Sequence, residues 1–279
     1  MSGTLYVVAT PIGNLEDITV RALRVLKEVA VVACEDTRHT RALLTHFAIG
    51  TPTVSYHEHN EALRTAQLIE RLSAGESVAL VSDAGTPAIS DPGHRLVAGA
   101  ARHGIRVVPV PGPSAVVTAL SASGLATDSF LFVGFLPPKQ GARAARLAEL
   151  ASERATLVFY EAPHRIGRTL AEMLEAYGDR EAVVARELTK LHEEFLRGPL
   201  SEVLASLAPE RMRGEFVVLV SGARDAASGA TVVDARERVA ELEAQGLARM
   251  DAIKQTAREL GIPKREIYTR VTDGPGPND

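Results

Sequence analysis

Short apolar runs alternate with amphipathic stretches along the first part of the chain. Runs rich in β-branched residues predict strands, whereas apolar positions that recur every three or four residues predict helices. In residues 1–126 the pattern predicts strands at 5–9, 30–34, 53–56, 77–82 and 106–110. It predicts helices at 19–29, 37–47, 61–74, 93–103 and 114–123. This alternation indicates an α/β domain with a mostly parallel sheet that is covered on both faces.

The pattern changes near Phe130 and again after residue 222. Residues 127–222 carry strand patterns at 130–135, 156–160, 181–186, around Phe195 and at 215–220, with helical patterns at 143–151 and 164–176. They predict a second α/β domain with a mixed sheet. Residues 223–279 carry only helical patterns, at 234–244, 249–260 and 264–271, and a glycine and a proline separate the last two. We therefore expect a small C-terminal helical domain, similar to a helix-turn-helix, with a disordered tail from Asp273.

The composition limits the classes of function. A single cysteine excludes an internal disulfide and a thiolate metal cluster. No apolar run approaches the ~18 residues that span a membrane, and the N-terminus lacks the pattern of a signal peptide. These features predict a cytoplasmic protein without a membrane partner. The net charge of −4 argues against a simple nucleic-acid binder, so contact with RNA would need local basic patches such as 139–146 and 249–271.

Loops rich in glycine, proline and hydroxyl groups follow several predicted strands. In open α/β sheets ligands bind beyond the carboxyl ends of the strands, where the loops 10–15, 35–38, 81–93 and 111–114 would line one side of a cleft. In the longest of them, Asp83 and Asp91 either pair with a ligand or cap turns and the following helix. Its spacing matches neither the dinucleotide fingerprint nor the phosphate-binding loop, so a phosphate cradle is not indicated.

Eight segments together resemble one family. In order they are ATPIGNL (9–15), CEDTR (34–38), HEHNE (57–61), SDAGTPAISDPG (82–93), PGPS (111–114), GFLP (134–137), FYEAPHR (159–165) and ARELTK (185–190). They resemble the ribosomal RNA small subunit methyltransferase I group of the tetrapyrrole methylase superfamily, over about residues 5–220. The first loop departs from the glycine-rich turn of the members that methylate tetrapyrroles, which argues against a porphyrinoid substrate.

The resemblance implies a fold, a reaction and a cofactor. The fold would be two α/β domains of the tetrapyrrole methylase type, a class III methyltransferase, with an S-adenosylmethionine cleft between them. The reaction would be 2′-O-methylation of a P-site cytidine of 16S rRNA in the small ribosomal subunit, carried out by a homodimer. The matching positions assign the cofactor to Pro11, Asp83, Ala84, Gly85, Thr86, Ile89, Tyr160, Arg186, Leu188, Gly214 and Glu215.

A ribose hydroxyl is a poor nucleophile when neutral, so the reaction needs a proton acceptor or a cation near the oxygen. His57, Glu58 and His59 form a titratable cluster directly after a predicted strand. Asp36 and Glu161, each with charged neighbours, are competing candidates, and all of these groups could instead pair with one another. The pattern selects no single base. The His-x-His spacing has no third ligand nearby, so we expect no metal site.

Candidate RNA contacts come from the basic patches and from one loop. They are Arg38, Lys139, Arg143, Arg146, Lys264 and Arg265. We expect the first basic patch, around Lys139, to be a flexible loop that reaches phosphates. Aromatic residues make up 4% of the chain, too few for a large base-stacking platform, so a structured subunit suits this surface better than short free RNA. A methylase of a tetrapyrrole or another small molecule, and a non-catalytic nucleic-acid binder that uses the C-terminal helices, remain as alternatives.

Overall fold

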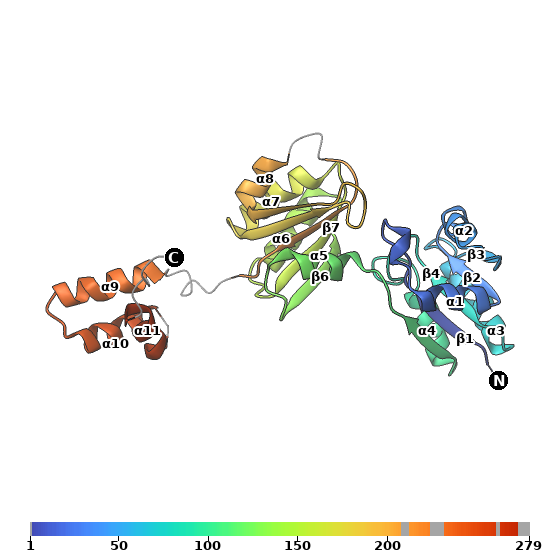
Figure 1. The fold of residues 1–279 in the computed structure, drawn as a ribbon, viewed down its shortest axis with the longest axis horizontal. Helices are drawn as coiled ribbons and strands as arrows, with labels where there is room; N and C mark the ends of the chain where they lie inside the picture. The colour runs from blue at the N-terminus through green and yellow to red at the C-terminus, as the bar shows by residue number, and fades with distance from the viewer. Residues whose placement is uncertain (1, 208–211, 224–231, 261–262, 273–279) are drawn as a thin grey trace. The chain divides into compact units, whose positions relative to one another are not determined.

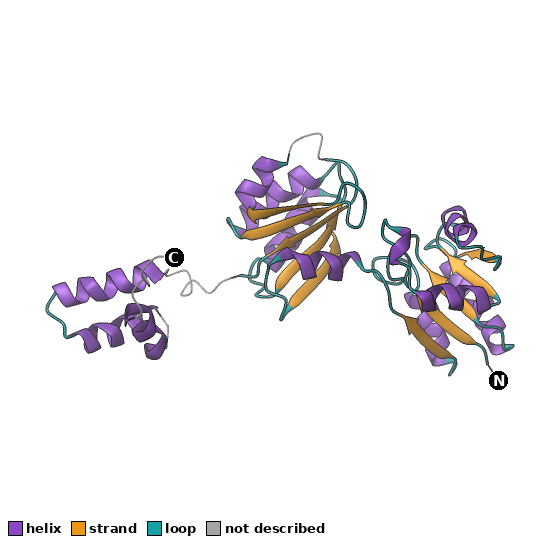
Figure 2. Cartoon of the chain, viewed as in Figure 1, coloured by secondary structure: helices purple, strands orange, loops and turns teal. Residues whose placement is uncertain are grey.

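The computed structural model describes residues 2–207, 212–223, 232–260 and 263–272. The chain divides into two compact units, Met1–Ser221 and Gly222–Asp279 (Figure 1). Strands and helices alternate in the first unit, and the described part of the second unit contains helices (Figure 2).

The first sheet of unit one is parallel, with the strand order β3-β2-β4-β1-β5. Its strands are β1 (Thr4–Val8), β2 (Val31–Cys34), β3 (Thr53–Ser55), β4 (Val78–Val81) and β5 (Arg106–Val110). Its helices are α1 (Val20–Glu28), α2 (Thr37–His46), α3 (Glu61–Ser73) and α4 (His94–Arg102). In β4, Ala79 and Val81 pack with α1 and α2, whereas Val78 and Leu80 pack with α3 and α4. The expected parallel sheet with two covered faces is confirmed.

The strand order places β4, β1 and β5 side by side, with β3 at the opposite edge. The loops after β1 and β4 are joined by two backbone hydrogen bonds: Thr10 N donates to Gly85 O at 2.9 Å and Gly85 N donates to Thr10 O at 3.1 Å. The buried Thr10 hydroxyl donates to Ser82 O at 3.1 Å. These bonds fix the two loops to each other at the carboxyl edge of the sheet.

The second sheet is mixed, with the order β6-β7-β10-β8-β9, in which only β6 and β7 pair in parallel. Its strands are β6 (Phe130–Phe135), β7 (Thr156–Glu161), β8 (Glu181–Arg186), β9 (Glu194–Pro199) and β10 (Phe216–Val220). Its helices are α5 (Ala115–Ser123), α6 (Gln140–Leu150), α7 (Ile166–Tyr177) and α8 (Leu200–Ser206). The mixed sheet is confirmed. The short α8 and the 3-10 helix η1 (Leu15–Asp17) were not anticipated by the pattern.

Helix α5 packs on the second sheet although it precedes the predicted boundary at residue 126. Val116 and Leu120 of this helix share a core with Val183 of β8 and Val217 of β10. Ile12, from the loop after β1, belongs to the same core. The loop after β1 and the helix after β5 therefore join the second sheet, and residues on both sides of the predicted boundary build one compact unit.

The second unit contains α9 (Val232–Ala244), α10 (Arg249–Leu260) and α11 (Lys264–Thr272). Val239, Leu242, Ile253 and Ile267 form a small buried core between these helices. The helices expected here are confirmed, whereas the expected linker at 226–230 and the expected disordered tail lie outside the described residues. Among the helices that the structure describes, none is long and apolar enough to cross a membrane.

Candidate active site

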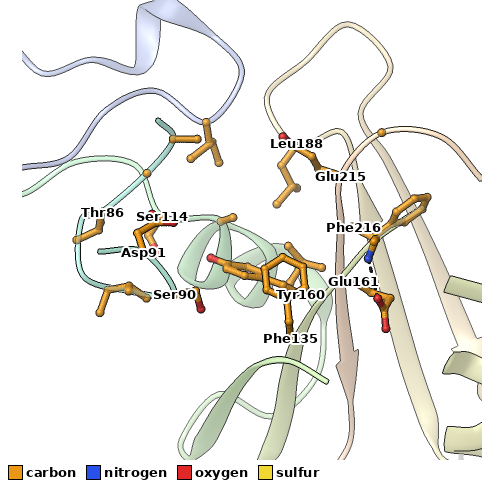
Figure 3. Close-up of a pocket in the computed structure, with 18 of the residues that line it drawn as sticks. Thr86, Ser90, Asp91, Ser114, Phe135, Tyr160, Glu161, Leu188, Glu215 and Phe216 are labelled. Carbon is orange, nitrogen blue, oxygen red and sulfur yellow. Dashed lines mark hydrogen bonds between the residues drawn. The ribbon is translucent and has the colours of Figure 1, made fainter. Parts of the chain in front are cut away.

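A cavity of about 390 Å³ lies within the first unit, where loops of the first sheet face the second sheet (Figure 3). Its volume falls within the ~300–1,000 Å³ that is usual for small-molecule sites. The loops after β1, β4 and β5 provide Ile12, Ala84, Gly85, Thr86, Ile89, Ser90, Asp91, Ser114 and Ala115. The second sheet and its loops provide Phe135, Tyr160, Glu161, Ala162, Pro163, Leu188, Gly214, Glu215, Phe216 and Val217.

The loop after β4 is held in an unusual backbone conformation. Gly85 has a φ of 81°, and the non-glycine residues Ala88 and Ser90 also have positive φ, at 66° and 62°. At the two non-glycine residues such conformations cost roughly 1–3 kcal/mol each and persist only where the surroundings enforce them. Here the Thr86 hydroxyl donates to Pro113 O at 3.2 Å, and Gly93 N donates to Glu61 Oε1 at 3.2 Å. The fold therefore maintains a strained loop directly on the cavity wall.

An aromatic wall faces this loop from the second sheet. A β-bulge in β6, at Gly134 with a φ of 75°, precedes Phe135, whose side chain stays 58% exposed at the cavity. The rings of Phe135 and Tyr160 lie 5.5 Å apart. Burial, helped by the nearby Asp91 carboxyl, raises the pKa of Tyr160 to about 12. The phenol is therefore neutral at physiological pH.

The cavity is closed by two turns that are bound to each other. The Glu187 carboxylate accepts hydrogen bonds from Lys190 Nζ at 3.0 Å and from Glu215 N at 3.1 Å. A Cβ at Gly214, which has a φ of 90°, would lie 2.3 Å from Glu187 Oε1, so the close approach requires glycine. These contacts hold the Gly214–Glu215 turn against the loop that carries Leu188.

The structure brings together most of the residues assigned to the cofactor. Ala84, Gly85, Thr86, Ile89, Tyr160, Leu188, Gly214 and Glu215 line the cavity. Pro11, Asp83 and Arg186 do not line it. Asp83 Oδ1 accepts the backbone N–H of Asp36 at 3.1 Å, and Arg186 Nε donates to Arg213 O at 2.9 Å. Asp83 and Arg186 thus support the loops that form the cavity.

The residues proposed for proton transfer are dispersed. Glu161 lines the cavity, but its carboxylate is buried and accepts from the Thr169 hydroxyl at 2.6 Å, the Ala162 N–H at 2.7 Å and Arg165. His57 lies outside the lining and binds Asn60 through its backbone N–H and its ring.

The other three proton-transfer candidates also lie outside the cavity lining. The Glu58 and His59 side chains are 79% and 84% exposed. Asp36 caps α2, and its hydrogen bonds with Arg38 hold its pKa well below the usual range.

Several lining residues had not been assigned to the cavity from the sequence. For Phe135, Ala162 and Pro163 the only sequence signal was membership of the motifs that carried the resemblance, whereas Asp91 and Ser114 also belong to loops that were expected to line the cleft. Asp91 stands out because burial raises the pKa of its carboxyl, with Asp83 adding to the rise and the Ser82 hydroxyl opposing it. Of the residues described around the cavity, the charged ones are all acidic.

The basic patch around Lys139 is not the flexible loop expected for its RNA contacts, and the helix predicted at 143–151 is confirmed. Gln140–Leu150 is helix α6, and Arg143 is fully buried, with Nη2 donating to Glu172 Oε1 at 2.7 Å. The assignment of Arg143 to RNA is therefore wrong, because its charge is already paired inside the fold. Lys139 is exposed and Arg146 is partly exposed, and Lys264 and Arg265 in the second unit are exposed.

Arg38 lies on an exposed basic face of α2. With Arg41, Ala42, Thr45 and His46 it surrounds an open hollow of about 600 Å³ on the protein surface. The helix contains no acidic residue. At its start, Asp36 pairs with Arg38 at 2.7 Å and also donates its backbone N–H to Asp83 of the loop after β4. The basic face therefore begins beside a loop of the cavity.

Comparison with known proteins first identifies the class of protein to which the chain belongs. The family model of tetrapyrrole (corrin/porphyrin) methylases matches residues 4–204. The crystal structure of uroporphyrin-III C-methyltransferase from Thermus thermophilus complexed with S-adenosyl homocysteine is similar, with a TM-score of 0.55 and 26% identity. That match covers 78% of this chain and 97% of the other.

Two curated relatives then identify a narrower group of proteins within this class. The ribosomal RNA small subunit methyltransferase I of Halalkalibacterium halodurans is 50% identical over 270 residues, which cover 95% of this chain and 93% of that protein. The protein of the same name from Pseudomonas aeruginosa is 49% identical over 278 residues, with 99% of each covered. The chain belongs to the tetrapyrrole methylase family and, within it, to the ribosomal RNA small subunit methyltransferase I group. The resemblance drawn from the sequence motifs is confirmed.

Proposed function

We propose that this protein transfers the methyl group of S-adenosylmethionine to the ribose 2′-oxygen of a P-site cytidine in 16S rRNA. The observation that carries the proposal is the near-full-length similarity to small subunit methyltransferase I proteins. The alternative of a non-catalytic nucleic-acid binder is disfavoured, since the matched region contains a built cavity. We further propose that the protein acts in the cytoplasm as a homodimer. Light scattering of the purified chain would test the homodimer.

The chemistry of the cavity fits S-adenosylmethionine. Aromatic and aliphatic side chains such as Phe135, Ile12 and Leu188 offer an apolar surface for an adenine ring, and the exposed residue Ala84 offers backbone hydrogen-bonding groups. The carboxyls of Asp91, Glu161 and Glu215 favour a ligand with positive charge, as a sulfonium has, over a phosphate-bearing dinucleotide. When bound, S-adenosylmethionine supplies an activated methyl group on that sulfonium.

The chain itself contributes the position of the ligand. Loops of the first sheet and the aromatic wall of the second sheet enclose the ligand, so orientation lowers the entropy cost of the displacement. The neutral Tyr160 phenol adds no charge of its own to the site. The residues of the cavity thus hold the donor while the acceptor must arrive from outside.

The exposed cations of the first unit support an RNA acceptor. Arg38, Arg41 and His46 present a basic face on a helix that starts beside a cavity loop. Such a face suits phosphates, which dominate the affinity of proteins for nucleic acids. We propose that these residues, together with Lys139, Arg146, Lys264 and Arg265, contact the RNA of the small subunit.

Methylation of purified small subunits tests the function. The subunits come from cells that lack the modification and are incubated with the protein and S-adenosylmethionine labelled in the methyl group. We expect label in 16S rRNA and a 2′-O-methylcytidine in the nucleoside digest by mass spectrometry. Tetrapyrrole substrates and a short single-stranded oligonucleotide serve as comparisons. Efficient methylation of a tetrapyrrole without labelled rRNA would overturn the proposal in favour of a small-molecule methylase.

A further inference from the structure

Lys190 belongs to the loop between β8 and β9, and its ammonium group binds two carboxylates at the rim of the cavity. It donates to Glu187 Oε1 and to Glu215 Oε2, each at 3.0 Å. Its side chain is 29% exposed, so both ion pairs are partly buried. Lys190 does not line the cavity, but Leu188 and Glu215 do. Figure 3 shows Leu188 and Glu215 on the side of the cavity opposite Thr86.

The stem of Lys190 reaches the loop after β1. A Cβ at Gly13 would lie 2.5 Å from Lys190 Cγ and 3.0 Å from Lys190 Cε, so the methylene groups lie against the backbone of Gly13. Ile12, next to Gly13 in the chain, lines the cavity and packs in one core with Leu188. One side chain therefore contacts the loop after β1, the loop after β8 and the turn before β10, and each of these segments carries a residue of the cavity wall.

The ammonium group of Lys190 keeps two like charges together. Burial disfavours the charged form of Lys190, but its hydrogen bonds to Glu187 and Glu215 outweigh this effect and raise its pKa. The group is therefore positively charged at physiological pH. Without it, the two carboxylates would repel each other, although the Glu215 N–H also donates to Glu187 Oε1 at 3.1 Å. The turn before β10 would then be held less firmly against the loop after β8.

The loop after β8 has a backbone that its own residues do not favour. Glu187 and Thr189 have positive φ values of 51° and 65° without being glycine. Such conformations persist only where contacts enforce them. Lys190 N donates to Glu187 O at 3.0 Å, and Thr189 N donates to Glu193 Oε2 at 2.6 Å. The position of Leu188 at the cavity therefore depends on contacts made by the rest of the loop, including those of Lys190.

We propose that Lys190 is a positioning residue for the S-adenosylmethionine site, an inference that rests on the proposed function. Its stem supports the loop after β1, and its ammonium group fixes the turn of Gly214 and Glu215 against the loop that carries Leu188. Because Lys190 does not line the cavity, it acts on the ligand through these segments. Affinity for S-adenosylmethionine should therefore depend on both the length and the charge of this side chain.

Calorimetric titration of the full chain with S-adenosylmethionine separates length from charge. K190M keeps most of the stem without the charge, K190A loses both, and K190R keeps the charge. We expect Kd to rise about tenfold for K190M, the effect of losing one hydrogen bond of a charged group, and more for K190A. K190R should recover most of the affinity. K27M, at an exposed lysine of α1 outside the cavity, is the matched control and should bind as wild type does.

Kinetics on small subunits that lack the modification give a second readout. K190M should raise KM for S-adenosylmethionine about as much as Kd, whereas kcat at saturating S-adenosylmethionine should stay within about threefold of wild type. This pattern is expected for a residue that acts on binding of the donor and not on the transfer step. A lower kcat with an unchanged KM would overturn the inference.

A double-variant cycle with Gly13 tests the contact of the stem. In the wild-type background, G13A should weaken binding, because its new methyl group would displace the stem of Lys190. In the K190A background the stem is absent, so G13A should cost less. Equal costs of G13A in both backgrounds would overturn the role of the stem and, with it, the inference.

Amide hydrogen exchange distinguishes positioning from direct contact. In K190M the amides of residues 12–15 and 213–216 should exchange faster than in wild type, while those of β2 keep the wild-type rate. Weaker binding without faster exchange in these segments would indicate that Lys190 contacts the ligand itself and would overturn the inference. A K190M Kd within threefold of wild type would also overturn it. Absence of S-adenosylmethionine binding by the wild-type protein would instead overturn the proposed function.

Discussion

The loop after β4 and the turn after β3 follow strands of the same sheet, and both carry titratable side chains, but only the first lines the cavity. Residues 84–91 include six that line it, whereas His57, Glu58 and His59 lie outside it. The difference follows from the strand order, in which β4, β1 and β5 are neighbours and β3 is at the far edge. A residue type that is suited to chemistry therefore becomes useful only where the sheet brings its loop to the ligand.

The same contrast between residue type and position separates two arginines of α6. Arg143 is 2% exposed at its side chain and paired with Glu172, whereas Arg146 is 43% exposed and paired with Glu149. We expect R143A to lower the free energy of unfolding by about 3–5 kcal/mol, because it removes the fully buried guanidinium and leaves the partly buried Glu172 without its hydrogen-bonded ion-pair partner. R146A should cost about 0–1 kcal/mol. Urea denaturation of both variants measures the change in the free energy of unfolding. Equal midpoints would refute the structural role of Arg143.

Substitutions of Gly85 and Gly50 compare the loop after β4 with the side of the sheet near β3. Val at position 85 would need a φ of 81°, and its Cβ would lie 3.3 Å from Ile12 Cγ2. We expect G85V to weaken S-adenosylmethionine binding by about 10- to 100-fold, corresponding to the strain of an unfavourable φ. G50V is the control, because a Cβ at Gly50 meets no atom within 4 Å and the residue precedes β3. Equal affinities by calorimetry would place the cofactor away from this loop.

The basic face of α2 precedes both compared regions in the chain. We expect R38A/R41A to weaken binding to small subunits by about tenfold at moderate salt and to reduce the salt dependence of binding. Binding of S-adenosylmethionine should stay unchanged, because neither residue lines the cavity. Filter binding over a range of salt concentrations measures the effect. A double variant with wild-type salt dependence would remove α2 from the RNA surface.

The Asp91 carboxyl should also affect stability. Because its pKa is raised in the folded protein, the native state binds this proton more tightly than the unfolded chain does. The contribution of Asp91 to stability is therefore present below the unfolded pKa and is lost as the pH rises through the folded value. D91N should raise Tm at neutral pH by roughly 1–3 °C, and this gain should shrink toward pH 4. If calorimetry found D91N less stable than wild type at neutral pH, this result would contradict the inference that burial of the charged Asp91 carboxylate is unfavourable.

The smallest effect is expected at the turn after β3. H57N keeps a polar side chain next to Asn60, whose amide bonds the His57 ring at 3.1 Å. We expect the methylation rate to change by less than about threefold, since the residue does not line the cavity. Single-turnover kinetics on small subunits measures it. A loss of 100-fold or more would support His57 as the proton acceptor and would contradict the contrast between the two regions.

The sequence by itself determined the order and type of most elements and the family. Alternation of apolar residues at two periods is a local property, so β1 to β10 and most helices could be identified from it. The short α8 could not, because seven residues contain too few turns to show a helical period. The sequence motifs also identified the segments that carry the site, including those of Gly85, Tyr160 and Leu188.

Only the tertiary structure decided which of these loops meet. In sequence, the segments after β2, β3 and β4 are equivalent, and the strand order that separates β3 from β1 is set by the packing of helices on both faces of the sheet. The burial of Arg143 depends on Glu172 of α7, and the raised pKa of Asp91 depends on burial in the fold. Desolvation and ion pairing arise from neighbours distant in the chain, so a local pattern does not contain them.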